Sequence, residues 1–164
     1  MARIYSNHMT TPPVQLSAGL VHARLRKKIA RITIGTLAVD DEARMMTFRS
    51  TDRLGHVYVS SDNASTGTLA DVGMYLAGSA HDGAVKDRDL FAAALAVDNG
   101  LARADVFTAN SVLDDEDRWK QLWEILGYSV DPKVDFDLVL TCVTTALSGA
   151  ATEVLVDVDY TSGD

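Results

Sequence analysis

The sequence has few of the residues that stabilise small secreted proteins or anchor proteins in membranes. It contains one cysteine among 164 residues, so an intrachain disulfide framework is excluded. Cys142 lies in the apolar run "FDLVLTCVTTA" (136–146), where a small buried hydrophobic side chain is expected. No apolar run approaches the ~20 residues of a membrane-spanning helix, and "MARIYSNHMTTPP" lacks the apolar centre of a secretory signal. These absences predict a protein that is assembled in a cytoplasm and has no membrane partner.

The common signatures of catalytic and metal sites are also absent from the sequence. There is no glycine-rich phosphate loop, no Gly-x-Ser-x-Gly, no His-Glu-x-x-His and no Cys-x-x-Cys. The four histidines, His8, His22, His56 and His81, are not spaced as metal ligands. We therefore expect a protein that is not an enzyme and has no catalytic residue, metal or cofactor.

Two pairs of acids leave an alternative open. Asp135 and Asp137, like Asp157 and Asp159, are two residues apart, so each pair could lie on one face of a strand. If the two strands were neighbours, the four carboxylates could hold a divalent cation or act as an acid and base. The protein would then be a cation-dependent binding module or a small enzyme. The interpretation that we favour is solvent-facing acids that prevent edge-to-edge association.

Charge is distributed unevenly along the chain. Residues 1–34 hold six basic residues and no acid, whereas the remainder holds 9 basic and 23 acidic residues, a net charge of −14. The acidic body argues against nucleic acid as a partner, because phosphate repels it. A basic segment next to an acidic body suits assembly between copies. The residues expected to bind a partner are Arg3, Tyr5, Arg24, Arg26, Lys27 and Lys28. The alternative is that "RLRKK" (24–28) is a solvated face beside acids of its own domain.

The chain divides into an extended basic N-terminal arm, residues 1–29, and a single β-sandwich domain, residues 30–164. "TTPP" (10–13) disfavours both helix and strand pairing, because proline lacks a donor and restrains the residue before it. Alternating or apolar runs bounded by turn residues predict strands at 30–39, 44–50, 56–60, 71–77, 105–109, 136–146 and 152–160. Gly73 marks a bulge or a close backbone approach. "LSGA" (147–150) is expected to join the last two strands as a hairpin.

Two helices are expected between these strands. Asp87 is a suitable N-cap for residues 87–98, and Leu90, Phe91, Ala94 and Leu95 would form one stripe. In the second helix, residues 115–126, the residues at i, i+3, i+4 and i+7 are Trp119, Leu122, Trp123 and Leu126, and Gly127 would end it. Both indoles are expected to be buried against the sandwich, because in water the stripe would form a large apolar patch.

These elements predict a mainly β fold, an antiparallel β-sandwich or barrel with two inserted helices. Their order also resembles a known group of proteins. The segments "DVGMYL" (71–76), "GAVKDRDLFA" (83–92), "LWEILG" (122–127) and "VDVDY" (156–160), within residues 50–160, resemble small structural proteins of tailed bacteriophages. The motifs are structural and bring no catalytic residue with them.

The resemblance implies a virion structural protein, specifically a capsid decoration or cement protein that binds and stabilises the head shell. Its expected partners are the major capsid protein and copies of itself, in an oligomeric arrangement on a particle assembled in the host cytoplasm. No small-molecule substrate is implied. The alternative within the virion is a neck or tail component that forms a ring.

Overall fold

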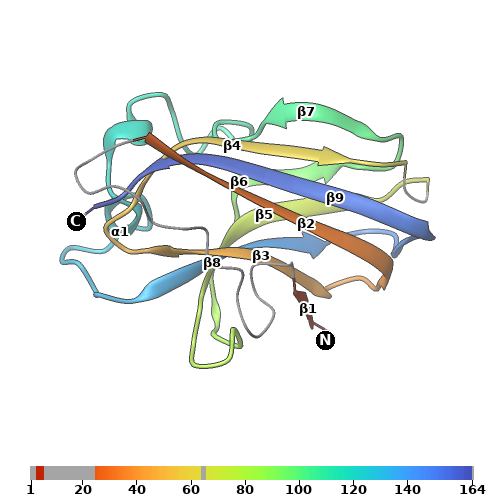
Figure 1. Ribbon diagram of the computed structural model, residues 1–164, viewed down its shortest axis with the longest axis horizontal. Coiled ribbons are helices and arrows are strands. Elements are labelled where there is room, and N and C mark those ends of the chain that lie inside the picture. Colours follow the sequence, from red (N-terminus) through yellow and green to blue (C-terminus); the bar gives the residue numbers. More distant parts are fainter. Residues whose placement is uncertain (1–2, 6–24, 64–65, 164) are drawn as a thin grey trace.

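The alternating run at residues 152–160 forms part of an inner strand, β9 (Leu147–Thr161), in one of two facing sheets (Figure 1). The computed structural model describes residues 3–5, 25–63 and 66–163. In the first sheet the strand order is β2 (Leu25–Leu37), β9 (Leu147–Thr161), β4 (Arg53–Ser61) and β7 (Leu101–Asp105), and every neighbouring pair is antiparallel. On β9 the side chains of Val154, Val156 and Val158 are buried, as the alternation predicts.

The second sheet has β8 at its centre and a short parallel strand at one edge. Its order is β1 (Arg3–Tyr5), β3 (Glu42–Arg49), β8 (Asp135–Cys142), β5 (Leu69–Leu76) and β6 (Val85–Ala96). β1 runs parallel to β3, and the other neighbours are antiparallel. All residues of β8 after Asp135 are buried, which confirms the prediction of a central strand covered on both faces.

The two sheets pack face to face around one apolar core. Phe48 of β3 meets Tyr160 of β9 edge to face, with ring centroids 5.4 Å apart. Phe91 and Phe107 form a second aromatic contact at 5.7 Å. The prediction of a mainly β, antiparallel two-layer fold is therefore confirmed.

The predicted helix at residues 87–98 is wrong, because this segment is strand β6. Its pairing with β5 jumps from Val72↔Ala92 to Met74↔Asp87, so several residues bulge out of the ladder. Because of this irregularity, the consecutive residues Leu90 and Phe91 are both buried. Two adjacent apolar residues in the sequence are also typical of a helix, which explains the wrong prediction. Opposite the bulge, a Cβ on Gly73 would collide with the backbone carbonyls of β6, which confirms the predicted close approach.

The predicted helix at residues 115–126 is largely wrong. Within the described residues, this stretch holds a single 3-10 turn, η1 (Asp117–Trp119), and a four-residue helix, α1 (Leu122–Ile125). Leu122 and Leu126 are buried, but Trp119 is 81% exposed and Trp123 is only half-buried. The predicted stripe fails because the backbone turns extended at Lys120 and Gln121. Gly127 does follow the helix, with a φ of 75°, as expected.

The predicted hairpin at "LSGA" is also wrong. β8 and β9 lie in different sheets, and residues 147–150 are the first part of β9, where they lengthen its pairing with β2. The chain therefore crosses from one layer to the other between Cys142 and Leu147.

Most of the predicted arm falls outside the described residues. Residues 6–24 belong to that part, while residues 3–5 form β1 and residues 25–29 are the first part of β2. The division of the chain into an arm, 1–29, and a domain, 30–164, stays a prediction.

A fully buried arginine ties the second sheet together on its outer face. Arg44 of β3 donates five hydrogen bonds: two to Glu42 Oε2 at 3.0 and 3.2 Å, one to Asp137 Oδ2 of β8 at 3.0 Å, and two to the carbonyls of Leu76 at 3.1 Å and Gly83 at 2.8 Å. The Arg44 side chain has no exposed area, and neither has that of Asp137. Every N–H of the guanidinium is thus satisfied inside the protein.

The carboxylate of Asp137 gathers further donors from its surroundings. The Thr47 hydroxyl donates to Oδ1 at 2.8 Å, and His81 Nδ1 lies 3.1 Å from Oδ2. His81 belongs to the loop between β5 and β6, which folds over Arg44. In that loop Gly83 has no room for a Cβ beside the Leu76 carbonyl, so only glycine allows this approach.

A second arginine crosses the same outer face. Arg88 of β6 donates to Asp40 Oδ1 at 2.9 Å and to the Cys142 carbonyl at 3.4 Å. Its Nε lies 2.8 Å from Asp71 Oδ2 as an ion pair without hydrogen-bond geometry. Between the two arginines, the Tyr75 hydroxyl and Thr141 Oγ1 are 2.7 Å apart. Burial raises the pKa of Tyr75, so its hydroxyl stays protonated.

The Arg44 network makes a prediction about stability. Replacing Arg44 with Met should lower the free energy of unfolding by about 3–5 kcal/mol, because Asp137 and Glu42 would remain buried without their cation. Urea denaturation measures the change. Arg31→Met is the matched control: Arg31 forms an exposed pair with Glu153 at 3.2 Å, and its loss should cost about 1 kcal/mol or less. Equal effects of the two substitutions would contradict the importance of the buried network.

Candidate functional site

The basic run of β2 alternates between the outer face of its sheet and the gap between the sheets. Lys27 lies on the outer face, where its Nζ is 3.0 Å from Asp157 and 3.3 Å from Asp159 on β9. Arg103 of β7 reaches the same Asp157 carboxylate at 2.9 Å. The outer face of this sheet is therefore covered by ion pairs between distant parts of one chain.

Lys28 points into the gap between the two sheets, at the edge where β2 lies beside β3. Its amine donates to the carbonyl of Thr47 on β3 and lies over the rings of Phe48 and Tyr160, 4.4 and 5.0 Å from their centroids. Burial lowers the pKa of Lys28 below its ordinary value. The amine thus joins the edge of one sheet to the edge of the other.

The six residues predicted to bind a partner have different surroundings. Arg3 and Tyr5 belong to β1, Arg24 lies outside the described residues, and Arg26 is half-exposed on β2. Lys27 and Lys28 have the intramolecular partners described above. For Lys27 the geometry agrees with the alternative interpretation, a solvated face beside acids of the same domain; Lys28 instead lies in the gap between the sheets. Partner binding by the six residues stays a prediction.

The two acid pairs do not come together. Asp135 and Asp137 belong to one sheet, whereas Asp157 and Asp159 belong to the other. Asp137 is occupied by Arg44, and Asp157 by Lys27 and Arg103. Across residues 3–5, 25–63 and 66–163, no group of three or more His, Cys, Asp or Glu side chains is placed to hold a metal ion. No helix of these same ranges is long and apolar enough to cross a membrane.

The cations beside Asp157 give a prediction about pH. Burial raises the pKa of this carboxyl, but the hydrogen bonds from Arg103 and Lys27 outweigh burial, and the net pKa is lowered. The folded state therefore binds fewer protons than the unfolded state, so this stability is present above pH ~4 and is lost as pH falls through the folded pKa.

Asp157→Asn should make the free energy of unfolding less dependent on pH between pH 7 and about 3. Urea denaturation at several pH values measures the slope. Arg103→Met removes one partner of the carboxylate and should change the slope in the same direction. A variant that loses as much stability on acidification as the native protein would contradict the role of these pairs.

The turn that carries Trp119 is held firmly although the indole is exposed. The neighbouring Arg118 donates to the Gly55 carbonyl and to Asp105 Oδ2, the latter at 3.2 Å, and its guanidinium lies 4.4 Å from the Phe107 ring centroid. The same Asp105 oxygen is 2.6 Å from His56 Nδ1. Burial opposes ionisation of Asp105, but the hydrogen bond with His56, the Phe107 N–H and Arg118 lower its pKa overall.

The helix that follows is fixed to the turn between β3 and β4. The N–H of Leu122 donates to the Asp52 carbonyl at 2.8 Å, and that of Trp123 donates to the Ser50 carbonyl at 3.0 Å. A capping box joins Gln121 and Glu124 at the start of α1. Hydrogen bonds thus attach the chain on both sides of Trp119 to the sandwich.

Several exposed apolar residues belong to segments at the end of the sandwich where α1 lies, and Figure 1 shows the arrangement of these segments. We call this region the α1 end: the start of β2, the turn between β3 and β4, and residues 106–134 with the start of β8. Of the eight large hydrophobic residues exposed within the described ranges, five belong to it: Leu25, Val112, Trp119, Val130 and Val134. The α1 end therefore carries more of the exposed large apolar residues than the rest of the described surface.

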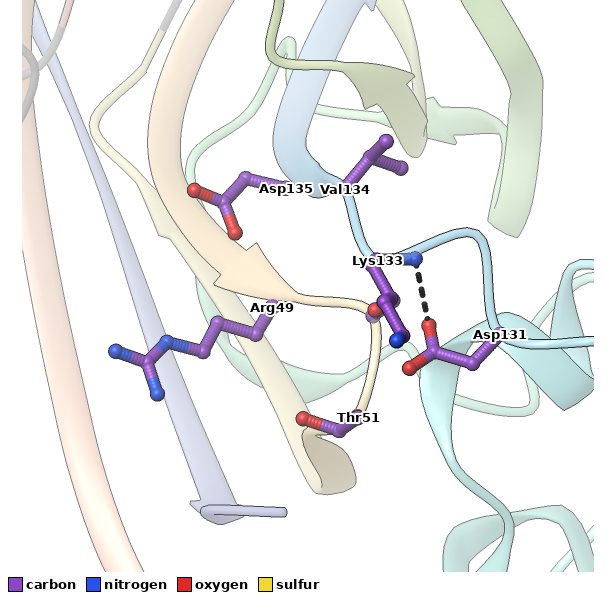
Figure 2. Close-up of a pocket in the computed structure, with 7 residues that line it drawn as sticks. Arg49, Thr51, Asp131, Lys133, Val134 and Asp135 are labelled. Atoms are coloured by element: carbon purple, nitrogen blue, oxygen red, sulfur yellow. Dashed lines mark hydrogen bonds between the residues drawn. The ribbon is translucent and has the colours of Figure 1, made fainter. Parts of the chain in front are cut away.

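A shallow groove of about 400 Å³ lies at the α1 end (Figure 2). Its walls are the end of β3 and the segment before β8, formed by Arg49, Ser50, Thr51, Asp131, Lys133, Val134 and Asp135. The Ser50 hydroxyl and the Lys133 N–H lower the pKa of Asp131. Figure 2 shows the Arg49 side chain extending away from Asp131 and Lys133. Because two cations and two carboxylates balance, the groove has no strong preference for one charge.

The sequence reasoning missed this apolar end. Helical spacing assigned Trp119 to the core, although the four acids before it, "DDED" (114–117), are a composition more typical of an exposed turn. The acids could have indicated that this segment faces water.

Comparisons with known proteins give a result at the level of the fold. No protein-family model matches the chain, and neither does any curated protein sequence. Among solved structures, the chain is similar to one described as the capsid of Ralstonia phage GP4, with a TM-score of 0.67 at 16% identity, over 99% of both chains. It is also similar to a chain of the cyanophage Pam1 capsid asymmetric unit, with a TM-score of 0.50 at 14% identity, over 93% of this chain and 99% of that one. The fold is thus one found in phage capsids.

Proposed function

We propose that the protein is a structural component of a phage virion, a decoration or cement protein attached to the head shell. The observation that carries this proposal is the end-to-end similarity to a chain of the GP4 capsid, in which neither chain has a large unmatched domain. The resemblance of residues 50–160 to small phage structural proteins supports the same role.

The charge of the body favours the outer surface of the shell. The sandwich includes the basic strand β2, so residues 25–164 hold 13 basic and 23 acidic residues, a net charge of −10. Packaged DNA would repel a body of this charge on the inner wall. Repulsion between acidic bodies also disfavours a continuous shell made from this chain alone. If each copy binds to another protein on the outer surface, the acidic sandwiches are separated from one another and from the DNA, and both repulsions are avoided.

The abundance of the protein in purified particles tests the proposed function. Quantitative mass spectrometry with an isotope-labelled standard should find hundreds of copies per particle, because a cement protein repeats over the whole shell. The major capsid protein in the same sample is the internal reference. Six or twelve copies would instead support a ring at the neck or tail, and absence from the particle would refute a virion role.

We also propose that the basic arm adds a second contact, with the shell or with neighbouring copies. Deleting residues 2–20 should leave a folded sandwich that binds particles at least about 10-fold more weakly, since contacts made by the arm would be lost. Circular dichroism and the urea midpoint check the fold, and co-sedimentation with particles measures binding. Binding as tight as that of the intact protein would contradict the role of the arm.

A further inference from the structure

We propose that the α1 end is the face that docks on the head shell, with Trp119 as its anchor. The partner is a surface of the shell protein that offers an apolar pocket bordered by lysine or arginine. This inference rests on the proposed function and adds to it the docking surface and the chemistry of the partner.

The exposure of Trp119 is the first observation behind the inference. The side chain is 81% exposed, the highest value among the large hydrophobic residues exposed within the described ranges. Val112 and Val130, also at the α1 end, are 61% and 73% exposed. Isolated exposed apolar residues need no explanation, but a tryptophan grouped with others at one end of the molecule is typical of a docking site.

The attachment of the chain on both sides of Trp119 is the second observation. The turn below Trp119 is held by Arg118, which contacts Gly55 and Asp105, and the following helix is held by backbone hydrogen bonds to Ser50 and Asp52. A tryptophan presented on a fixed backbone loses little conformational entropy when it binds. Central aromatic residues of this kind supply much of the affinity of protein interfaces.

The charge around Trp119 selects the partner. Residues 114–117 are four consecutive acids, and the two basic residues nearby are already paired, Arg118 with Asp105 and Asp115, and Lys120 with Asp117. The hydrogen bond from Lys120 lowers the pKa of Asp117, so this carboxylate stays charged. The segment that carries Trp119, residues 114–120, is therefore net negative, and a surface complementary to it must carry basic side chains beside its apolar pocket.

Binding of purified variants to particles that lack this protein tests the inference. Trp119→Ala should weaken binding by at least about 30-fold, the loss expected of an interface anchor, while its urea midpoint stays unchanged. Glu116→Lys should weaken binding as well and reduce the dependence of the association rate on salt. Val39→Ala, an exposed apolar residue in the turn between β2 and β3 at the opposite end, is the matched control and should bind like the native protein.

The outcomes separate this inference from the proposed function. If the native protein does not bind particles, the proposed function fails whatever the variants do. If the native protein binds and Trp119→Ala binds equally tightly, only the docking face is wrong. If Trp119→Ala binds particles normally but reduces self-association in light scattering, the α1 end joins copies of this chain, and the inference is again overturned.

Discussion

The buried guanidinium of Arg44 is the interaction on which the second sheet depends. It joins β3 to β8 through Asp137, and joins both strands to the end of β5 through the Leu76 carbonyl and to the loop between β5 and β6 through the Gly83 carbonyl. A buried ion pair contributes little net stability compared with apolar packing, but removing one partner leaves a charge stranded in the interior. The network therefore works as a constraint on geometry, because all five donors are satisfied only when β8, the end of β5 and the loop meet around the guanidinium. That arrangement leaves the other face of the sheet free to pack on β9 and its neighbours.

The sequence predicts those strands whose side chains either alternate or stay apolar without interruption. β9 and β8 are recognisable because their apolar residues follow the burial of each strand. In β9 the apolar residues mark one buried face, and in β8 they mark two. β6 was not recognisable, because alanine favours helix and a bulge places Leu90 and Phe91 side by side in the core. Strand pairing overrode local propensity there. The crossing from β8 to β9 is also not predicted. A short connection between two strands has a similar sequence whether the strands pair as a hairpin or lie in different sheets.

The candidate site was less predictable than the fold, because its character depends on contacts distant in sequence. Lys27 is more than a hundred residues from Asp157, and no local pattern indicates that the two would meet. Neighbouring lysines have opposite roles, since Lys28 faces the gap between the sheets and Lys27 faces outward. Trp119 shows the converse error. Its spacing from Leu122 predicts a common buried stripe, but the backbone between η1 and α1 is extended, and the indole is therefore exposed to solvent.

We propose that an acidic sandwich with a phage-capsid fold attaches to the outside of a head shell through its α1 end. An electron-microscopy map of the purified particle tests this claim most directly. We expect density for the sandwich in many symmetry-related positions on the outer surface of the head, with the turn at Trp119 facing the shell and the turn between β2 and β3 facing solvent. Density confined to the neck or tail, or a sandwich seated with the α1 end facing solvent, would contradict it.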